Sequence, residues 1–239
     1  MKQVVKYIIG TITFLVICYF GYQGYSLYIY NAARITSDYK EVKDHFKIGD
    51  TIIAKHVALT QNEYKNIQGI KIKNIVKKFD IYKQNATAET YVLYNDRKEI
   101  EKSFSISVGD SYIKKIKSNQ FGEDKSFQTL KKKEILKKYN IRNDIELWEK
   151  IQEKKEEKSN IFTDVKTMKE QYFFQYTMLE LPVFENITLI NGDLTGYIFN
   201  ISADMKEVHI LDNDKQYTFL FNGAYQSQEI EEFLNTIII

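Results

Sequence analysis

Residues 7–33 read YIIGTITFLVICYFGYQGYSLYIYNAA, a run of 27 residues without a charged side chain. Crossing about 30 Å of hydrocarbon takes roughly 20 apolar helical residues, and Tyr7–Ile29 meets that requirement. Tyrosines crowd the second half of the run, as aromatic side chains do near a membrane–water interface. The sequence therefore predicts one transmembrane helix over residues 7–30.

The charges beside this run predict its orientation. Lys2 and Lys6 precede it, and short loops rich in lysine and arginine stay in the cytoplasm. We therefore expect residues 1–6 to form a cytoplasmic tail and residues 31–239 to form an extracytoplasmic domain. The Lys-, Ile- and Asn-rich composition is typical of a bacterial protein. The expected location is the cell membrane of a bacterial envelope, with a single pass.

Three other interpretations of the apolar run fit it less well. A cleaved signal peptide needs a small-residue site directly after a short apolar core, but Ala32-Ala33 lies too far downstream. A lipoprotein reading uses Cys18, which follows the large Ile17. A buried core helix of a soluble protein would carry a polar face at helical spacing. An uncleaved signal anchor is favoured.

The composition outside the run is that of a folded chain. The 239 residues are 44% hydrophobic and 28% charged, with one proline and ten glycines. A single cysteine excludes a disulfide framework and a cysteine-based zinc site. The net charge of +2 conceals an asymmetry, because residues 35–163 carry +7 and residues 164–239 carry −8. A nearly neutral, exported chain is not expected to bind nucleic acid.

The order of the predicted elements indicates an α+β fold. Short β-like runs occupy residues 51–108, and a lysine- and glutamate-rich helical stretch over residues 109–163 marks a possible sub-boundary. Four further β-like runs lie in residues 187–221, joined by Asn-Gly and Asp/Asn-rich turns, which are hairpin signals. We expect an exported mixed domain with a C-terminal antiparallel β meander and a closing helix that begins at Ser227 or Gln228. The spacing of three apolar residues of this helix, Ile230, Phe233 and Leu234, predicts that they are buried.

No motif predicts catalytic chemistry. The three histidines lack the spacing of a metal site, and His209 is expected to be a surface or half-buried strand histidine. Gly109-Asp110-Ser111 is similar to the nucleophile block of GDSL-type esterases, but a tyrosine follows where leucine is expected and no downstream Asp-x-x-His occurs. Asp212-Asn213-Asp214 has oxygen ligands, yet the loop lacks the glycine and glutamate of an EF-hand. We predict no catalytic residue, cofactor or metal site.

The densest basic cluster lies near the middle of the chain and consists of Lys131, Lys132, Lys133, Lys137 and Lys138. Such a cluster is a candidate contact for an anionic surface, and in an exported domain the accessible anions are lipid head groups and wall polymers. The alternative is the solvated face of an amphipathic helix, which the alternating charges of residues 146–158 favour.

Taken together, these patterns predict a membrane-anchored, non-enzymatic binding or interaction protein of the cell envelope. Its expected ligand is a protein or peptide, and immunity against a toxin or bacteriocin is one instance of such a role. Two alternatives remain open at this point. One is an envelope-associated hydrolase of wall polymer or peptide whose site comes from scattered residues; the other is a structural or assembly protein acting through its transmembrane helix.

Overall fold

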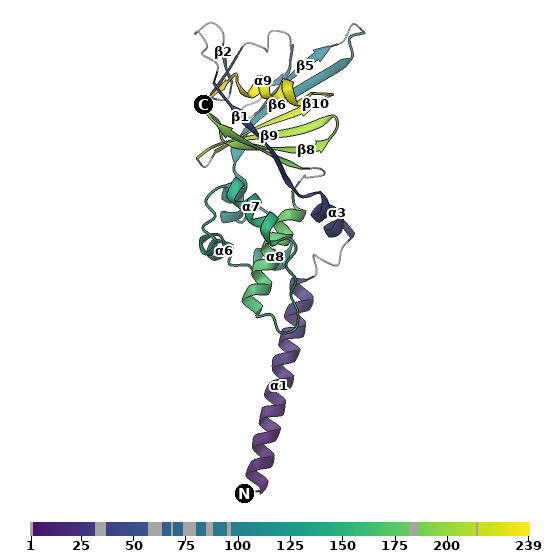
Figure 1. Cartoon of the computed structure of the whole chain (residues 1–239), viewed down its shortest axis with the longest axis vertical. Coiled ribbons are helices and arrows are strands. Elements are labelled where there is room, and N and C mark those ends of the chain that lie inside the picture. Colours follow the sequence, from purple (N-terminus) through teal and green to yellow (C-terminus); the bar gives the residue numbers. More distant parts are fainter. Residues whose placement is uncertain are drawn as a thin grey trace. The chain divides into compact units, whose positions relative to one another are not determined.

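A computed structural model describes residues 2–31, 37–56, 64–67, 69–73, 80–84, 88–94, 97–181, 186–213 and 215–239 of the chain (Figure 1). It confirms an α+β chain that combines a long apolar N-terminal helix with a mixed β-sheet. The described residues form two compact units. Unit 1 contains residues 1–43, 122–140 and 150–181, and unit 2 contains residues 44–121, 141–149 and 182–239.

Helix α1 (Lys2–Tyr30) begins unit 1 and is 29 residues long. Its length and apolar composition suffice to cross a membrane, since Gln3–Tyr30 forms a candidate span. Side chains from Gln3 to Tyr22 are exposed on every side of the helix, which in water leaves a large apolar surface uncovered. Helices with polar residues all along one side bury the opposite face; this part of α1 has no such pattern.

The remaining helices of unit 1 are α5 (Lys125–Gln128), α6 (Lys132–Lys138) and α8 (Val165–Leu179), with most of α3 (Ser37–His45) and the second half of α7 (Asp144–Lys154). The sequence predicts one helix that Ser126 caps and Asn140 ends, whereas the structure has two, α5 and α6. Asp124 caps α5 by accepting a hydrogen bond from the backbone N–H of Phe127. Asn140, at φ 54°, follows α6 as predicted.

An aromatic core holds α5 against α8. The Phe127 ring stacks on Phe173 and Tyr176, with centroids 5.9 and 4.5 Å apart. The segment Tyr172–Leu181, whose sequence favours neither helix nor strand, forms the second half of α8 and its C-terminal end. Aromatic residues at this spacing are therefore core residues, and burial of each ring stabilises unit 1 by roughly 2–3 kcal/mol.

Unit 2 is built on an eight-stranded sheet with the order β1-β7-β8-β9-β10-β6-β5-β4. Its strands are β1 (Ile48–Ala54), β4 (Asp80–Gln84), β5 (Ala88–Tyr94), β6 (Ile100–Asp110), β7 (Ile187–Gly192), β8 (Gly196–Ser202), β9 (Met205–Asp212) and β10 (Lys215–Asn222). Strand β1 pairs parallel to β7, and the other neighbours pair antiparallel.

Strands β7 to β10 form the antiparallel meander that the turn residues predicted. Gly192 ends β7 at φ 105°, a left-handed conformation that glycine adopts without a Cβ clash. Asn213, at φ 54°, lies in the turn between β9 and β10; Asp214, part of the same predicted turn, lies outside the described residues. The pairing of Tyr217 with Ile210 and of Phe219 with Val208 places apolar side chains on one face.

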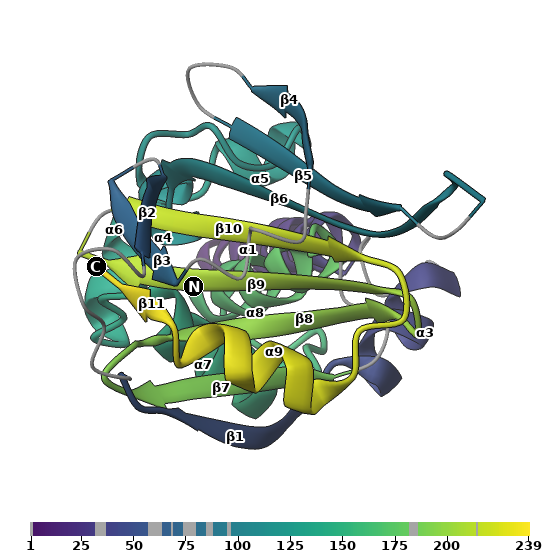
Figure 2. The same cartoon turned by 90° about the horizontal axis from the view of Figure 1, so that it is seen from above.

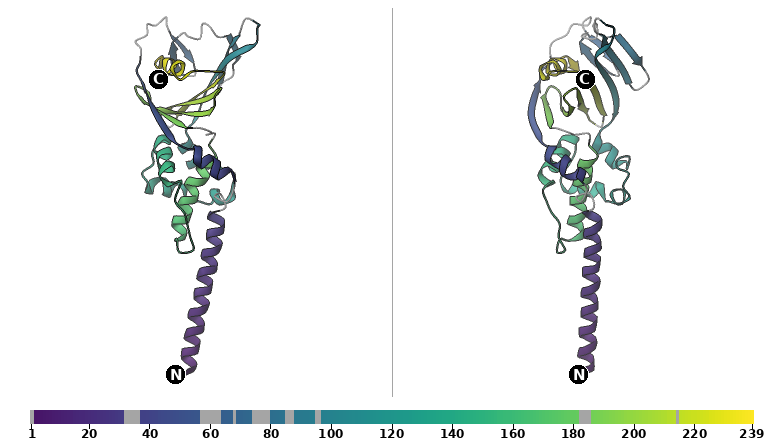
Figure 3. Two further views of the ribbon diagram at one scale, coloured as in Figure 1. Left: turned by 45° about the vertical axis from the view of Figure 1, so that its right-hand side comes forward. Right: turned by 90° about the vertical axis from the view of Figure 1, so that its right-hand side faces the viewer.

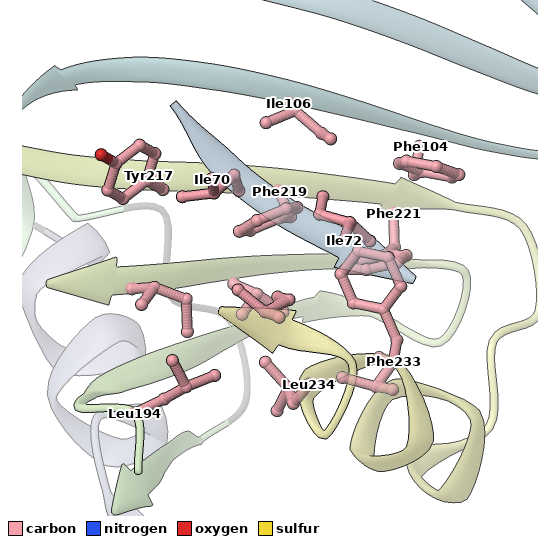
Figure 4. Packing of buried hydrophobic residues seen from close by; sticks show 14 of the residues in the cluster. Ile70, Ile72, Phe104, Ile106, Leu194, Tyr217, Phe219, Phe221, Phe233 and Leu234 are labelled. Atoms are coloured by element: carbon pink, nitrogen blue, oxygen red, sulfur yellow. The ribbon is translucent and has the colours of Figure 1, made fainter. Parts of the chain in front are cut away.

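That face carries the principal core of unit 2 (Figure 4). Helix α9 (Ser227–Leu234) lies across it in Figure 2 and contributes Ile230, Phe233 and Leu234, as predicted from their spacing. A three-stranded sheet of β2 (Tyr64–Ile67), β3 (Ile70–Lys73) and β11 (Ile237–Ile238) completes the core with buried isoleucines. The opposite face of the meander carries polar side chains and Phe199, described below.

Candidate functional site

The last third of α1 packs onto α8 inside unit 1. Gln23 and Ser26 are each only 4% exposed, and Leu27 and Tyr30, on the same side of the helix, are half-buried. The Tyr30 ring meets Tyr172 of α8 edge to face, with centroids 5.7 Å apart. Residues 23, 26, 27 and 30 follow helical spacing, so this part of α1 behaves as a helix of a folded unit.

A pocket of about 290 Å³ opens beside this contact. Helix α1 lines it with Tyr22, Tyr25 and Tyr30, and Lys125 and Lys169 line it from α5 and α8. The pocket therefore combines aromatic walls with two ammonium groups and several hydroxyls. This combination suits an amphipathic ligand that carries a negative charge, because the rings offer apolar contact and the lysines offer charge.

The two lysines of the pocket face solvent. Lys125 and Lys169 are exposed, and none of the ion pairs between described residues involves either of them. The ammonium group of Lys169 lies 5.8 Å from the centre of the Tyr30 ring, a cation–π contact. Their charges are thus available to an anion in the pocket, with the solvent screening that exposed groups have.

A hydrogen-bonded acid and two tyrosines fix α5 against α8 next to the pocket. The Tyr172 hydroxyl donates to Asp124 at 2.8 Å, and the Asp124 N–H donates to the Tyr176 hydroxyl at 3.1 Å. Burial raises the pKa of Tyr172, and Asp124 raises it further. Burial also acts to raise the pKa of Asp124, but the hydrogen bonds from Tyr172 and the backbone outweigh it and lower that pKa.

The five lysines predicted as a contact for an anionic surface are distributed around α6. Lys131 pairs with Glu134 at 3.0 Å, and Lys138 pairs with Glu170 at 2.5 Å. Lys132 is 3% exposed, and its ammonium lies 4.4 Å from the centre of the Phe127 ring. Burial lowers its pKa.

The other two, Lys133 and Lys137, are exposed. Contact of this cluster with an anionic surface stays a prediction, and Lys132 is positioned for packing.

A buried polar cluster lies in unit 2 between the meander and the helices α4 (Tyr112–Lys117) and α7. The Asp144 carboxylate, which is fully buried, accepts hydrogen bonds from the backbone N–H groups of Tyr112 and Ile113 and from the Tyr197 hydroxyl. The Tyr197 hydroxyl oxygen also lies 3.2 Å from the Gln216 side-chain oxygen. Burial raises the pKa of Asp144 and outweighs these hydrogen bonds.

His209 belongs to the same cluster. Its Nδ1 lies 2.5 Å from the Gln216 amide nitrogen, and its Nε2 lies 2.9 Å from the Glu207 carboxylate. His209 is 1% exposed, whereas the sequence predicted a surface or half-buried strand histidine. The rings of Phe199 and Tyr197 cover the imidazole, with centroids 5.1 and 4.7 Å away. Because the cluster is closed off from solvent, its suitable role is to position α4 and α7 on the sheet.

An exposed apolar pair projects from the β5–β6 hairpin. Tyr94 pairs across the strands with Ile100, and they are 40% and 52% exposed. Strand β10 pairs with β6 only as far as Ser103, so this end of the hairpin extends beyond its neighbour, as Figure 2 shows. An exposed aromatic and an aliphatic side chain together are typical of a protein-binding surface.

Comparison with protein-family models, with curated proteins and with solved structures finds no match to this chain. Among the described residues, no group of three or more histidine, cysteine, aspartate or glutamate side chains is placed to hold a metal ion. The pocket was missed by sequence reasoning because its walls come from segments 22–30, 125–129 and 165–169. The one local signal was the polar pair Gln23 and Ser26 at helical spacing within an apolar helix.

Proposed function

We propose that this chain is a membrane-anchored, non-enzymatic binding protein of a bacterial cell envelope, with its folded units outside the cytoplasm. The observation that carries the proposal is the change of surroundings along α1. Its first two-thirds expose apolar side chains on all sides, and its last third packs into unit 1. A helix of this kind couples a lipid-embedded segment directly to a folded unit.

Orientation rests on the two lysines ahead of the apolar run. Lys2 and Lys6 favour a cytoplasmic N-terminus by the positive-inside rule. The ligand that we propose is a protein or peptide, and protection against a toxin is one form that such binding takes. The exposed pair of Tyr94 and Ile100 supports a protein or peptide ligand. Apolar side chains that project from a hairpin are stabilised when a partner covers them, because removal of apolar surface from water lowers the free energy.

Membrane anchoring and orientation are tested together by cysteine labelling in intact cells. The native Cys18 is replaced by serine, and a new cysteine is introduced either at Glu232, exposed on α9, or at Gln3. An impermeant maleimide should label Glu232→Cys in intact cells and Gln3→Cys only after lysis. The orientation is contradicted if both positions are labelled only after lysis, or if both are labelled in intact cells. Release of the protein from membranes by alkaline carbonate contradicts the anchor.

Binding is tested by a photo-reactive residue at Ile100. The control is the same residue at Ile53 in β1, which is exposed to a similar degree, 50% against 52%. In membranes of the source cells, Ile100 should give one discrete adduct, and Tyr94→Ser should reduce it about ten-fold or more, as removal of a central interface aromatic does. Equal adducts at both positions, or none at Ile100, would argue against this surface.

A further inference from the structure

Phe162 is the most exposed large apolar side chain in the described part of the chain, at 78%. The turn that carries it is held by its own hydrogen bonds. Asn160 accepts from the Phe162 N–H through its side chain at 2.8 Å and from the Thr163 N–H through its carbonyl at 3.0 Å. The Thr163 hydroxyl in turn accepts from the Asn160 N–H at 2.9 Å. The outward position of the ring is therefore built into the turn.

The turn lies beside α1, as Figures 1 and 3 show. The Phe162 ring meets the Phe20 ring edge to face, with centroids 6.3 Å apart. One turn further along α1, a methyl group on Gly24 would contact the end of the Ile161 side chain at 3.9 Å. Phe162 thus extends the apolar surface of α1 laterally at the level of Phe20. The surroundings that cover α1 at this level therefore cover Phe162 as well.

The level of Phe20 agrees with the thickness of a bilayer. Lys2 and Phe20 are 18 residues apart, about 27 Å along a helix that rises about 1.5 Å per residue. A hydrocarbon layer is about 30 Å thick, so a boundary at Phe20 leaves Lys2 close to the opposite boundary. Lys6 then lies about 21 Å from Phe20 along the helix, within the layer, and its long side chain extends toward the interface. The Tyr22–Tyr30 segment then lies in the head-group layer.

The pocket lined by Lys125 and Lys169 falls in that same layer. Its α1 residues lie between Tyr22 and Tyr30, which is about 3–15 Å beyond Phe20 along the helix axis. Tyr22, Tyr25 and Tyr28 are 59–69% exposed, and tyrosines concentrate at this depth. Two exposed ammonium groups here face the layer in which lipid phosphates lie.

We infer that unit 1 is seated on the membrane, with Phe162 in the hydrocarbon boundary beside Phe20 and the phosphate of an anionic lipid head group in the pocket that Lys125 and Lys169 line. The inference rests on the proposed anchoring by α1 and extends it. It makes the lipid surface a second binding partner of the folded part. It also ends the hydrocarbon-embedded segment near Phe20, nine residues before the predicted Ile29.

The depth of Phe162 is measured on the full chain in lipid vesicles. Phe162→Cys, in a Cys18→Ser background, carries a polarity-sensitive fluorophore, and the control is Lys133→Cys, exposed on α6. Lipids brominated near the head of the acyl chain should quench the probe at position 162 at least about three-fold more than the control. If the protein floats with the vesicles but the probes at positions 162 and 133 are quenched equally, the seating of unit 1 is contradicted and the anchor is not. Failure to float contradicts both.

The head group is identified by comparing two brominated lipids at equal mole fraction, phosphatidylglycerol and phosphatidylcholine. Quenching of the probe at position 162 should show about a five-fold or greater preference for phosphatidylglycerol, the factor that one lysine contributes at an anionic surface. Lys125→Gln with Lys169→Gln should abolish the preference, and Lys133→Gln with Lys137→Gln should preserve it. Equal quenching by both lipids overturns the head-group assignment. If the preference for phosphatidylglycerol is lost in the Lys133→Gln and Lys137→Gln variant, the head-group site lies on α6 instead of in the pocket.

Discussion

Asp144 shows at the scale of one residue how a buried carboxyl group orders unit 2. Its carboxylate accepts hydrogen bonds from two backbone N–H groups at the start of α4, at 3.0 and 2.8 Å, and from a hydroxyl of β8. The two N–H groups at the start of α4 have no acceptor within their own helix. Asp144 therefore joins α7, α4 and the sheet through one side chain.

Removal of this carboxylate should destabilise unit 2. We expect Asp144→Ala to lower the free energy of unfolding by about 2–4 kcal/mol, because it leaves buried donors without acceptors. The native Trp148, the single tryptophan and fully buried in the same unit, reports the transition in denaturant. Glu149→Ala, at an exposed position of the same helix, should change the value by less than about 0.5 kcal/mol. Equal effects would exclude a special role for the carboxylate.

Asp124 gives unit 1 a dependence on acid. Its pKa is lowered in the folded state, because hydrogen bonds from Tyr172 and the backbone outweigh burial. The folded state then binds fewer protons than the unfolded chain, whose aspartates titrate near about 3.9. The contribution is complete above that pH and is lost as the pH falls through the folded pKa.

Thermal unfolding measured by circular dichroism between pH 6 and pH 3 tests this sign. Asp124→Asn should remove part of the fall in melting temperature at acid pH, while Glu123→Gln, its exposed neighbour, should leave the fall unchanged. Parallel curves for the wild type and Asp124→Asn would show that Asp124 does not carry the dependence.

At the scale of elements, two strand glycines test how closely the meander is packed. A Cβ on Gly196 in β8 would enter the van der Waals shell of the His209 carbonyl oxygen in β9, whereas a Cβ on Gly109 in β6 would meet nothing within 4 Å. Backbone atoms in a paired strand have little room to move. Gly196 is therefore required by the close approach of β8 and β9.

We expect Gly196→Ala to lower the free energy of unfolding by about 1–3 kcal/mol, the usual cost of an overpacked site. Gly109→Ala should be neutral or should stabilise by up to about 1 kcal/mol, because alanine restricts the unfolded chain. Denaturant unfolding followed by Trp148 fluorescence compares the two. A neutral Gly196→Ala would mean that β8 shifts away from β9 at little cost.

Sequence patterns predicted the helices and strands better than they predicted which strands pair with each other. The Asn191-Gly192 turn and the alternating runs around it identified the meander, and residues 230, 233 and 234 identified the buried face of α9. The parallel pairing of β1 with β7 and the pairing of β6 with β10 join segments more than 100 residues apart. Such pairing depends on the fit of whole faces, which a local pattern does not contain.

The candidate site had the same limitation. Lysine spacing predicted a basic face on α6, yet Lys132 turns inward over Phe127 because its long apolar stem packs well while the charge meets an aromatic ring. The pocket lies where α1, α5 and α8 meet, and no segment of it carries a motif. What the sequence did predict was the apolar part of α1, because length and lack of charge are local properties.

At the scale of the whole molecule, the two units are interleaved along the chain. Unit 1 takes residues 1–43, returns at 122–140 and again at 150–181. The first of these segments includes α1, so the apolar helix is part of a folded unit as well as its start. Leu27 and Tyr30 are half-buried on α8, and burial of a large apolar side chain contributes roughly 1.5–3 kcal/mol when complete.

Two truncated chains separate these roles of α1. A chain that begins at Phe20 loses the exposed apolar part and keeps the face that packs on α8, while a chain that begins at Ser37 loses both. We expect the longer chain to leave the membrane and to melt about 5 °C above the shorter one, since about 2 kcal/mol shifts a chain of this size by 4–8 °C. Circular dichroism and limited proteolysis within α8 measure the difference. Equal melting temperatures would mean that the last third of α1 adds nothing to unit 1, and that the whole helix is free to lie in lipid.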